Sequence, residues 1–220
     1  MTEVASSREL SSPERLQAFT DAVVAIALTL LILPLMESVG ELADHKGTTA
    51  QWFAEERYPL LGFVLSFLLI SVFWVHHHRL FRNVRLVDSV LLWLTIAWMF
   101  TIVWMPVATA LSAQMHADWA QPLVYIGTLF ATSFLLLLAR VYLRSHPHLH
   151  DLDEAATRSG IQAGTIVAAL FLAALILALI VPDLGNLPLL LMVLSEPLQR
   201  LARRRSLKNS EREDVDPAQK

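Results

Sequence analysis

The sequence predicts an all-α, polytopic membrane protein with six transmembrane helices. Three observations favour this fold class: 55% of the 220 residues are hydrophobic, only 17% are charged, and long apolar runs recur along the chain. A soluble domain carries about 25% charged residues, and a hydrocarbon core of about 30 Å requires about 20 helical residues per crossing. A soluble globule and a disordered chain are therefore both excluded.

Five apolar segments have nearly the length of a membrane-spanning helix. We expect them at Phe19–Met36, Tyr58–Val75, Val87–Ala110, Leu123–Tyr142 and Ile161–Val181. A sixth, Leu187–Leu201, is shorter and is interrupted by Glu196-Pro197, so it is either a tilted span or a helix that only partly enters the bilayer. The expected organisation is a cytoplasmic segment over 1–18, a six-helix transmembrane domain over 19–201, and a basic, then disordered tail over 202–220.

The distribution of positive charge predicts the orientation. If the N-terminus is cytoplasmic and all six segments cross, 15 of the 17 Lys and Arg face the cytoplasm, leaving only Lys46 and Arg57 outside. Cytoplasmic loops carry such an excess of Lys and Arg. The run Arg203–Arg205 favours the sixth crossing, because it would otherwise lie outside. We expect a multi-pass protein of the plasma membrane with both termini in the cytoplasm.

Composition excludes several other classes of function. The chain has no cysteine, which removes iron–sulfur clusters, thiolate metal sites and cysteine nucleophiles together. No GxGxxG or Walker-type loop occurs among its seven glycines. A net charge of −3 provides no basic field for a nucleic-acid partner. We therefore expect no nucleic-acid partner, and no enzyme activity or cofactor that depends on these groups.

The first span contains an aspartate, Asp21, at the mouth of an apolar helix. A carboxylate there either fixes the helix end at the interface or holds this helix against its neighbours through Arg or His partners. At 100° per residue, Ile26, Leu30 and Leu33 lie within about 60° of one another, with Thr29 beside them, and Asp21 points about 140° away from Ile26. Such a stripe is ordinarily a packing or lipid-facing surface, so its spacing alone assigns no function.

Two motifs carry a resemblance to a known family. Arg15-x-x-x-Phe19-Thr20-Asp21 resembles the RxxxFSD signature of the TMEM175 potassium channels, with Thr20 in place of the usual serine. The segment Phe73–Phe81, FWVHHHRLF, looks like the FWxxHHxxF segment of that family. It lies at the end of the second span, the same span as in the family. The resemblance covers about Arg15–Leu201, and its specific motifs lie in the first two spans.

The resemblance implies a prokaryotic member with one six-helix repeat, four copies of which surround a pore lined by their first helices. The permeant species would be K⁺, and this sequence, like the family, lacks a TVGYG filter. It further implies a hydrophobic constriction at Ile26, Leu30 and Leu33 and a selectivity role for Thr29. The structural network implied by the signature comprises Arg15, Phe19, Thr20, Asp21, Trp74, His76 and His77.

Other readings of the polar residues stay open. Adjacent His76, His77 and His78 point about 100° apart on a helix, which does not suit a single metal ion. The loop His146–Glu154, with three histidines and three carboxylates, is either a divalent-cation site or a solvated loop. A proton-coupled secondary transporter using Asp21 and the His76–His78 cluster is the alternative function. A membrane enzyme with a histidine-bound metal is a third.

Overall fold

The computed structural model describes residues 12–115, 118–181 and 187–194. The regular secondary structure of these residues is helical, apart from one isolated β-bridge between Val84 and His150. In chain order the elements are α1 (Pro13–Leu30), α2 (Leu33–Asp44), α3 (Thr49–Glu55), α4 (Arg57–Phe81), α5 (Ser89–Gln114), α6 (Ala120–Ser145), η1 (Pro147–Leu149), α7 (Glu154–Ile180) and η3 (Leu187–Leu194).

Five helical stretches are long and apolar enough to cross a membrane: α1 with α2, α4, α5, α6 and α7. They match the five longer predicted spans, so an all-helical polytopic protein is confirmed. The helices extend beyond the apolar windows, because polar residues continue them at both ends. Of the predicted sixth span, Leu187–Leu194 is described; it forms the 3₁₀-helix η3, which packs against α7. Glu196-Pro197 and the basic tail lie outside the described residues.

The first predicted span, Phe19–Met36, needs correction. The helix α1 begins earlier, with Pro13 in its first turn, so it extends into the segment 1–18 expected to precede the membrane domain. A turn at Leu31–Ile32 then separates α1 from α2. Pro34, in the first turn of α2, has no N–H to donate to the carbonyl four residues earlier, which explains an interruption here. Leu33 therefore belongs to α2 and not to α1.

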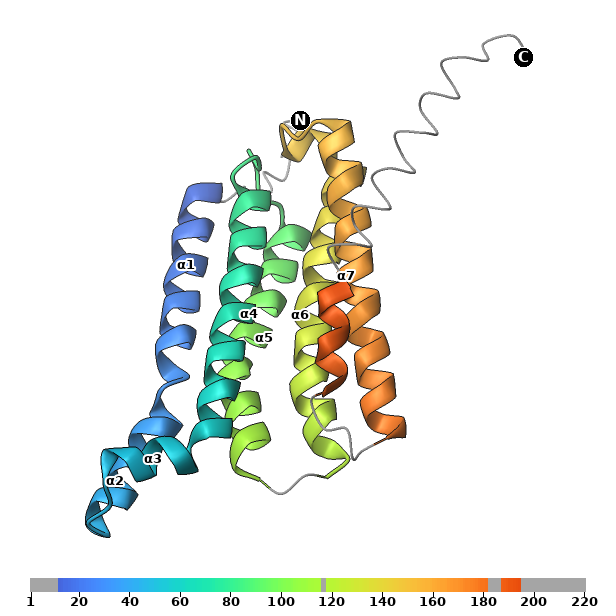
Figure 1. Ribbon diagram of the computed structural model, residues 1–220. Coiled ribbons are helices and arrows are strands. Elements are labelled where there is room, and N and C mark those ends of the chain that lie inside the picture. Colours follow the sequence, from blue (N-terminus) through green and yellow to red (C-terminus); the bar gives the residue numbers. More distant parts are fainter. Residues whose placement is uncertain (1–11, 116–117, 182–186, 195–220) are drawn as a thin grey trace, which may run out of the picture.

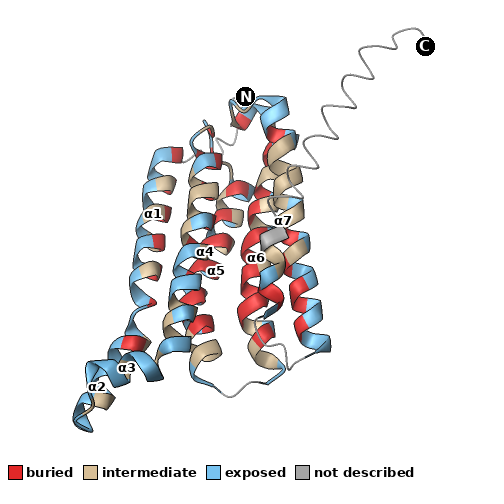
Figure 2. Ribbon diagram, viewed as in Figure 1, coloured by how far each residue is buried: buried red, intermediate tan, exposed pale blue. Residues whose placement is uncertain are grey.

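The five long helices form an up-and-down bundle (Figure 1). The helix α1 lies at one edge and packs against α4 and α5, whereas α6 packs against both α5 and α7. Burial is greatest on α5 and α6, in the middle of the bundle (Figure 2). The largest fully buried side chains of these two helices are Trp98, Leu91, Ile102, Met105, Ile126, Leu129 and Leu143.

Buried hydroxyl groups join the central helices. Thr109 of α5 donates to Ser66 of α4 at 2.8 Å, and the Ser66 hydroxyl lies 2.9 Å from that of Tyr125 on α6. Closer to the start of α5, Thr132 of α6 donates to Thr101 of α5 at 2.9 Å. Interhelical hydrogen bonds hold membrane helices together where the hydrophobic effect between them is weak. The helices α4, α5 and α6 are therefore linked into one unit.

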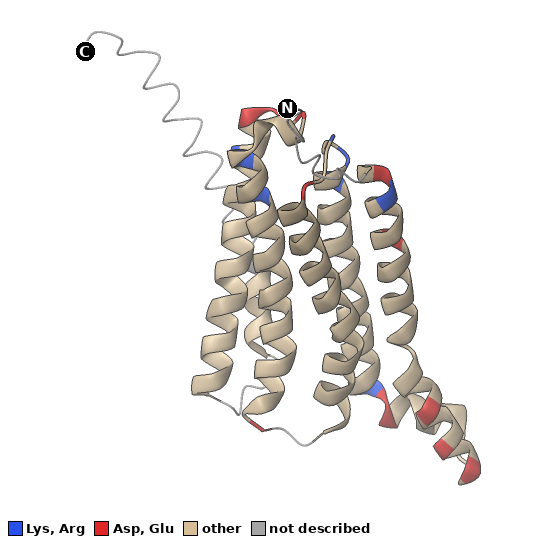
Figure 3. Ribbon diagram, turned by 180° about the vertical axis from the view of Figure 1, so that it is seen from behind, with Lys and Arg blue, Asp and Glu red and all other residues tan. Residues whose placement is uncertain are grey.

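The two ends of the bundle differ in charge (Figure 3). We call one end the basic end, because it holds all the described Lys and Arg except Lys46 and Arg57. Its members are Arg15, Arg79, Arg82, Arg85, Arg140, Arg144 and Arg158. The opposite, acidic end is formed around α2 and α3 and carries Glu37, Glu41, Asp44, Glu55 and Glu56. There, Trp52 of α3 donates to Ser38 of α2 at 3.0 Å and ties the two short helices together.

Candidate ion pathway along the first helix

The helix α1 has one buried and one open face. Its buried side chains recur every three or four residues: Leu16, Thr20, Val24 and Ala27. This spacing directs one stripe of the helix toward α4 and α5. The predicted constriction residues lie on the open side, where Ile26 is 60%, Leu30 38% and Leu33 47% exposed. All three are uncovered in the single chain, although the turn at Leu31–Ile32 separates Leu33 from the other two.

Thr29 adds a polar group to this open face. Its hydroxyl is exposed and donates to the main-chain carbonyl of Ile26 at 2.8 Å. A hydroxyl has one donor and two acceptor lone pairs, so the Thr29 oxygen can still accept a hydrogen bond or contact a cation. Ala22 and Ala25 are also exposed on α1. The open surface therefore combines large aliphatic side chains, small residues and one hydroxyl.

Asp21 lies on the side of α1 that faces α4. The indole Nε1 of Trp74 donates to Asp21 Oδ1 at 2.7 Å, and His78 Nδ1 lies 3.7 Å from Asp21 Oδ2. The amide Nε2 of Gln17 lies 2.9 Å from the same His78 nitrogen. A carboxylate near the membrane is costly unless polar groups surround it. These contacts supply that environment and tie α1 to α4 at the basic end.

The other residues of the first motif lie in different surroundings. Thr20 is fully buried, and its hydroxyl donates to the Leu16 carbonyl at 2.8 Å. Phe19 is 60% exposed. Arg15 is exposed and has no hydrogen-bond or ion-pair partner among the residues that the structure describes. The structure thus brings Asp21 and Trp74 together and leaves Arg15 and Phe19 on the outside of α1.

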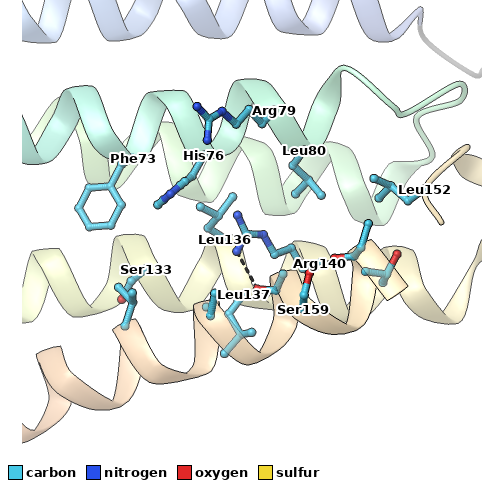
Figure 4. Close-up of a pocket in the computed structure, with 16 residues that line it drawn as sticks. Phe73, His76, Arg79, Leu80, Ser133, Leu136, Leu137, Arg140, Leu152 and Ser159 are labelled. Carbon is cyan, nitrogen blue, oxygen red and sulfur yellow. Dashed lines mark hydrogen bonds between the residues drawn. The ribbon is translucent and has the colours of Figure 1, made fainter. Parts of the chain in front are cut away.

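The three consecutive histidines point to three different places. His77 is buried, with its ring stacked between those of Phe81, at 4.3 Å, and Trp98, at 4.2 Å. His76 lines a cavity between α4, α6 and α7 (Figure 4), and His78 faces α1. Across the described parts of the chain, no group of three or more His, Asp or Glu is placed to hold a metal ion.

The second histidine cluster helps to fold the loop between α6 and α7. His146 stacks on Tyr142, with a ring distance of 4.2 Å, and its Nδ1 lies 2.9 Å from the Tyr142 carbonyl. His150 Nε2 lies 2.9 Å from another main-chain carbonyl of α6. Asp151 pairs with Arg85, from the loop between α4 and α5. These side chains contact the end of α6 and the loop before α5, and the rings of His146 and His148 meet edge-on at 5.9 Å. Among the described residues they form no group placed to hold a metal ion.

Sequence reasoning missed two members of the network around Asp21, namely Gln17 and His78. Both could have been found from helical spacing, because residues four apart share a face. Gln17 lies four residues before Asp21, and His78 lies four residues after Trp74. The rings of Trp74 and His78 are 5.4 Å apart. The contact thus joins this pair on α4 to the pair of Gln17 and Asp21 on α1.

Comparison with known proteins bears on this arrangement. A family model described as the endosomal/lysosomal potassium channel TMEM175 matches residues 15–106, which include α1 and the motif-bearing end of α4. A potassium channel of Streptomyces collinus is 33% identical over 155 residues, covering 66% of this chain and 72% of the relative. The TMEM175 of Gallus gallus, named an endosomal/lysosomal proton channel, is 28% identical over 147 residues, 67% of this chain but 28% of that protein.

A solved structure shares the fold. The crystal structure of a lysosomal potassium-selective channel TMEM175 homologue from Chamaesiphon minutus aligns with a TM-score of 0.67 at 24% identity. The alignment covers 83% of this chain and 97% of that one. The likeness therefore extends well beyond the two sequence motifs and includes most of the bundle.

The described residues define an all-helical bundle with five helical stretches long and apolar enough to cross a membrane. Two findings assign the chain to a family. One is the length and identity of the Streptomyces match, and the other is the family model, which covers α1, α4 and most of α5. The chain belongs to the TMEM175 family, as its two motifs predicted. This is a family of channels and not of enzymes.

Proposed function

We propose that the chain forms a potassium-permeable channel in a cell membrane. The family membership supports a channel, and the bacterial relative from Streptomyces is named a potassium channel. The apolar bundle supports a location within a bilayer. No cofactor is needed for this activity, because the ion itself is the only species that has to bind and leave.

The pathway in this proposal is formed by four copies of the chain with α1 around a common axis. The observation that carries it is the exposure of Ile26 and Leu30 on α1, and of Leu33 at the start of α2, within the segment matched by the family model. The helix α1 lies at an edge of the bundle, so copies can approach it without displacing α4 or α5. Exposed Ala22 and Ala25 favour close approach of neighbouring helices.

The gate in this proposal is hydrophobic. A narrow ring of Ile and Leu side chains expels water, and an ion cannot cross a dry constriction. Opening requires the α1 helices to separate or rotate until a partly hydrated cation fits. Thr29, next to the constriction, would then present its hydroxyl oxygen in place of a lost water molecule. The turn at Leu31–Ile32 places Leu33 in α2, beyond the helix that carries Ile26 and Leu30.

The proposed orientation has the basic end and both termini in the cytoplasm. Positive residues gather at cytoplasmic ends of membrane proteins, and the described Lys and Arg gather at one end of this bundle. In a prokaryotic cell the corresponding membrane is the plasma membrane.

Proton transport is the second candidate function. The vertebrate relatives are named proton channels, and Asp21 with His78 forms a titratable pair at the basic end. In the structure Asp21 points from α1 toward His78 on α4, on a different side of α1 from Ile26. A coupled transporter would use the pair as a proton relay, whereas the proposed channel uses it to fasten α1 to α4.

Ion flux into liposomes tests the proposal. We expect the purified protein to pass K⁺ down its gradient without an opposing proton flux. Replacing Ile26 or Leu30 by Asn should raise the flux severalfold, because an amide side chain wets the constriction. Ile176→Asn is the matched control, since Ile176 is 50% exposed but lies on α7, and its flux should stay at the wild-type level.

Two results would contradict these assignments. Unchanged flux in both Ile26→Asn and Leu30→Asn would reject this face as the pathway. A K⁺ flux that stops when proton movement is blocked would favour the coupled transporter. Chemical crosslinking measures the number of chains in the assembly, and we expect four.

A further inference from the structure

A second candidate site lies between α4, α6 and α7 at the basic end, on the far side of α4 from α1. The structure has a cavity of about 370 Å³ here, and the side chains of His76, Arg79 and Arg140 border it (Figure 4). Among the described residues, no Asp or Glu lines it. The cavity therefore combines two permanent cations and an imidazole without a neutralising carboxylate.

The two arginines have hydrogen-bonding capacity to spare. Among the described residues, neither Arg79 nor Arg140 forms an ion pair. Arg140 Nη1 donates to the main-chain carbonyl of Gly160 on α7 at 2.9 Å, and a guanidinium has four further N–H donors. Gly164 leaves space for this group, because a Cβ at that position would lie 3.3 Å from Arg140 Nη1. One N–H of Arg140 is thus bonded to the main chain, and the other N–H donors of the guanidinium are available to a ligand.

The hydroxyl groups of the cavity have already committed their protons. Ser133, Thr157 and Ser159 donate to main-chain carbonyls of their own helices or helix caps, at 2.8 to 3.0 Å. The free donors of the site are therefore mainly the cationic side chains. Planar guanidinium groups bind carboxylates and, with high preference, phosphate oxygens through paired N–H donors.

The cavity changes character with depth. His76 and Arg140 lie in the middle of the cavity, Leu80 and Leu152 border it toward the basic end, and Phe73 and Val167 form an apolar floor further into the bundle. There the ring of Phe73 packs against that of Phe171 on α7, with centroids 6.0 Å apart, and joins the two helices. Cationic side chains next to an apolar floor match an amphiphile with an anionic head. Basic pockets between membrane helices bind anionic headgroups in this way.

We propose that this cavity binds a phosphate oxyanion between Arg79 and Arg140. The source is either the headgroup of an anionic phospholipid in the adjacent leaflet or free phosphate. A phospholipid would also place its acyl chains against the apolar floor. This site is separate from the α1 face, and its occupancy does not depend on the channel proposal.

Lipid binding to the purified full-length protein in detergent tests the site. Native mass spectrometry would compare dioleoylphosphatidylglycerol with zwitterionic dioleoylphosphatidylcholine, and a parallel series would add inorganic phosphate as a competitor. We expect preferential retention of the anionic lipid, and we expect Arg79→Gln and Arg140→Gln each to weaken it about tenfold, the value of one charge-assisted hydrogen bond. Arg79 is exposed, and its side chain forms no hydrogen bond or ion pair with the described residues, so Arg79→Gln remains informative should Arg140→Gln fold poorly.

Arg144→Gln provides the matched control, because Arg144 is an exposed arginine one turn further along α6 and does not line the cavity. Its lipid retention should stay within about twofold of wild type. If phosphate binds with the same dependence on Arg79 and Arg140 while the lipids do not differ, the oxyanion site stands with free phosphate as its ligand. Equal losses in Arg144→Gln and Arg79→Gln, or retention unaffected by either cavity arginine, would overturn the proposal.

Discussion

The contact around Asp21 shows how helical spacing selects the partners of a charged residue. Trp74 and His78 both reach Asp21 because they lie one turn apart on α4. The motif predicted that Asp21 and Trp74 lie with the imidazoles of His76 and His77, whereas the imidazole beside Asp21 is that of His78. The packing of α5 accounts for the position of His77, since Trp98 stacks on His77 and holds that ring in the core. The spacing of Trp74 and His78 on α4 favours His78, but the burial of His77 against α5 could not be predicted from the sequence of α4 alone.

The Asp21–Trp74 hydrogen bond should stabilise the fold. We expect Trp74→Phe to lower the free energy of unfolding by about 1–2 kcal/mol, since it removes a hydrogen bond to a charged group that is partly exposed. Trp93→Phe is the control, because Trp93 is 68% exposed on α5 and should change little. Thermal unfolding in detergent measures both.

A double-mutant cycle separates this hydrogen bond from the packing of the indole. If Asp21→Ala and Trp74→Phe cost as much together as the sum of their separate effects, the two side chains are not coupled. Less than additive loss is expected. Asp21→Ala should also reduce the yield of assembled protein, whereas a fully stable assembly with altered ion permeability alone would contradict a fastening role for Asp21.

At the scale of elements, hydropathy located the long helices well but described their ends and connections poorly. Apolar composition is needed only where a helix contacts hydrocarbon, so α7 can begin at polar Glu154, well before the predicted Ile161. The segment between the first two spans was expected to be outside the membrane, and its helices α2 and α3 were not anticipated. Local hydrogen bonds form them, such as the reciprocal pair between Thr48 and Gln51 at the start of α3.

The hydroxyl contacts that join α4, α5 and α6 are also absent from any hydropathy pattern. Ser66 is fully buried and contacts both Thr109 and Tyr125. We expect Ser66→Ala to lower the free energy of unfolding by about 0.6–1.7 kcal/mol, the range for interhelical hydrogen bonds in membranes. Ser71→Ala, on the same helix, removes only a bond to the main chain of that helix and should be close to neutral. Equal effects in the two variants would assign no special role to the interhelical contact.

At the scale of the whole molecule, the separation of cations from the acidic end is the main signal of orientation. The sequence pattern and the three-dimensional arrangement agree on which residues share an end, because an up-and-down bundle returns alternate loops to the same side. The positions of the helices relative to one another were harder to predict from the sequence. Contacts such as that of Arg140 with Gly160 depend on how closely α6 and α7 approach, which no single segment specifies.

The orientation can be measured by labelling single cysteines, since the natural chain contains none. We expect Lys46→Cys, at the acidic end, to react with a membrane-impermeant maleimide applied outside intact cells. Arg82→Cys, at the basic end, should react only after the membrane is permeabilised. The opposite pattern would reverse the proposed topology, and reaction of both positions from outside would contradict membrane spanning by α4.

The helices α2 and α3 place five carboxylates, Glu37, Glu41, Asp44, Glu55 and Glu56, near only two cations, Lys46 and Arg57. This local surplus of negative charge enriches counterions in the water next to that end, as any charged surface does over a Debye length of about 8 Å at physiological salt. Monovalent cations thus accumulate beside the molecule before any of them encounters a binding group. The enrichment fades as bulk salt rises, so relative to the bulk it is greatest when cations are scarce.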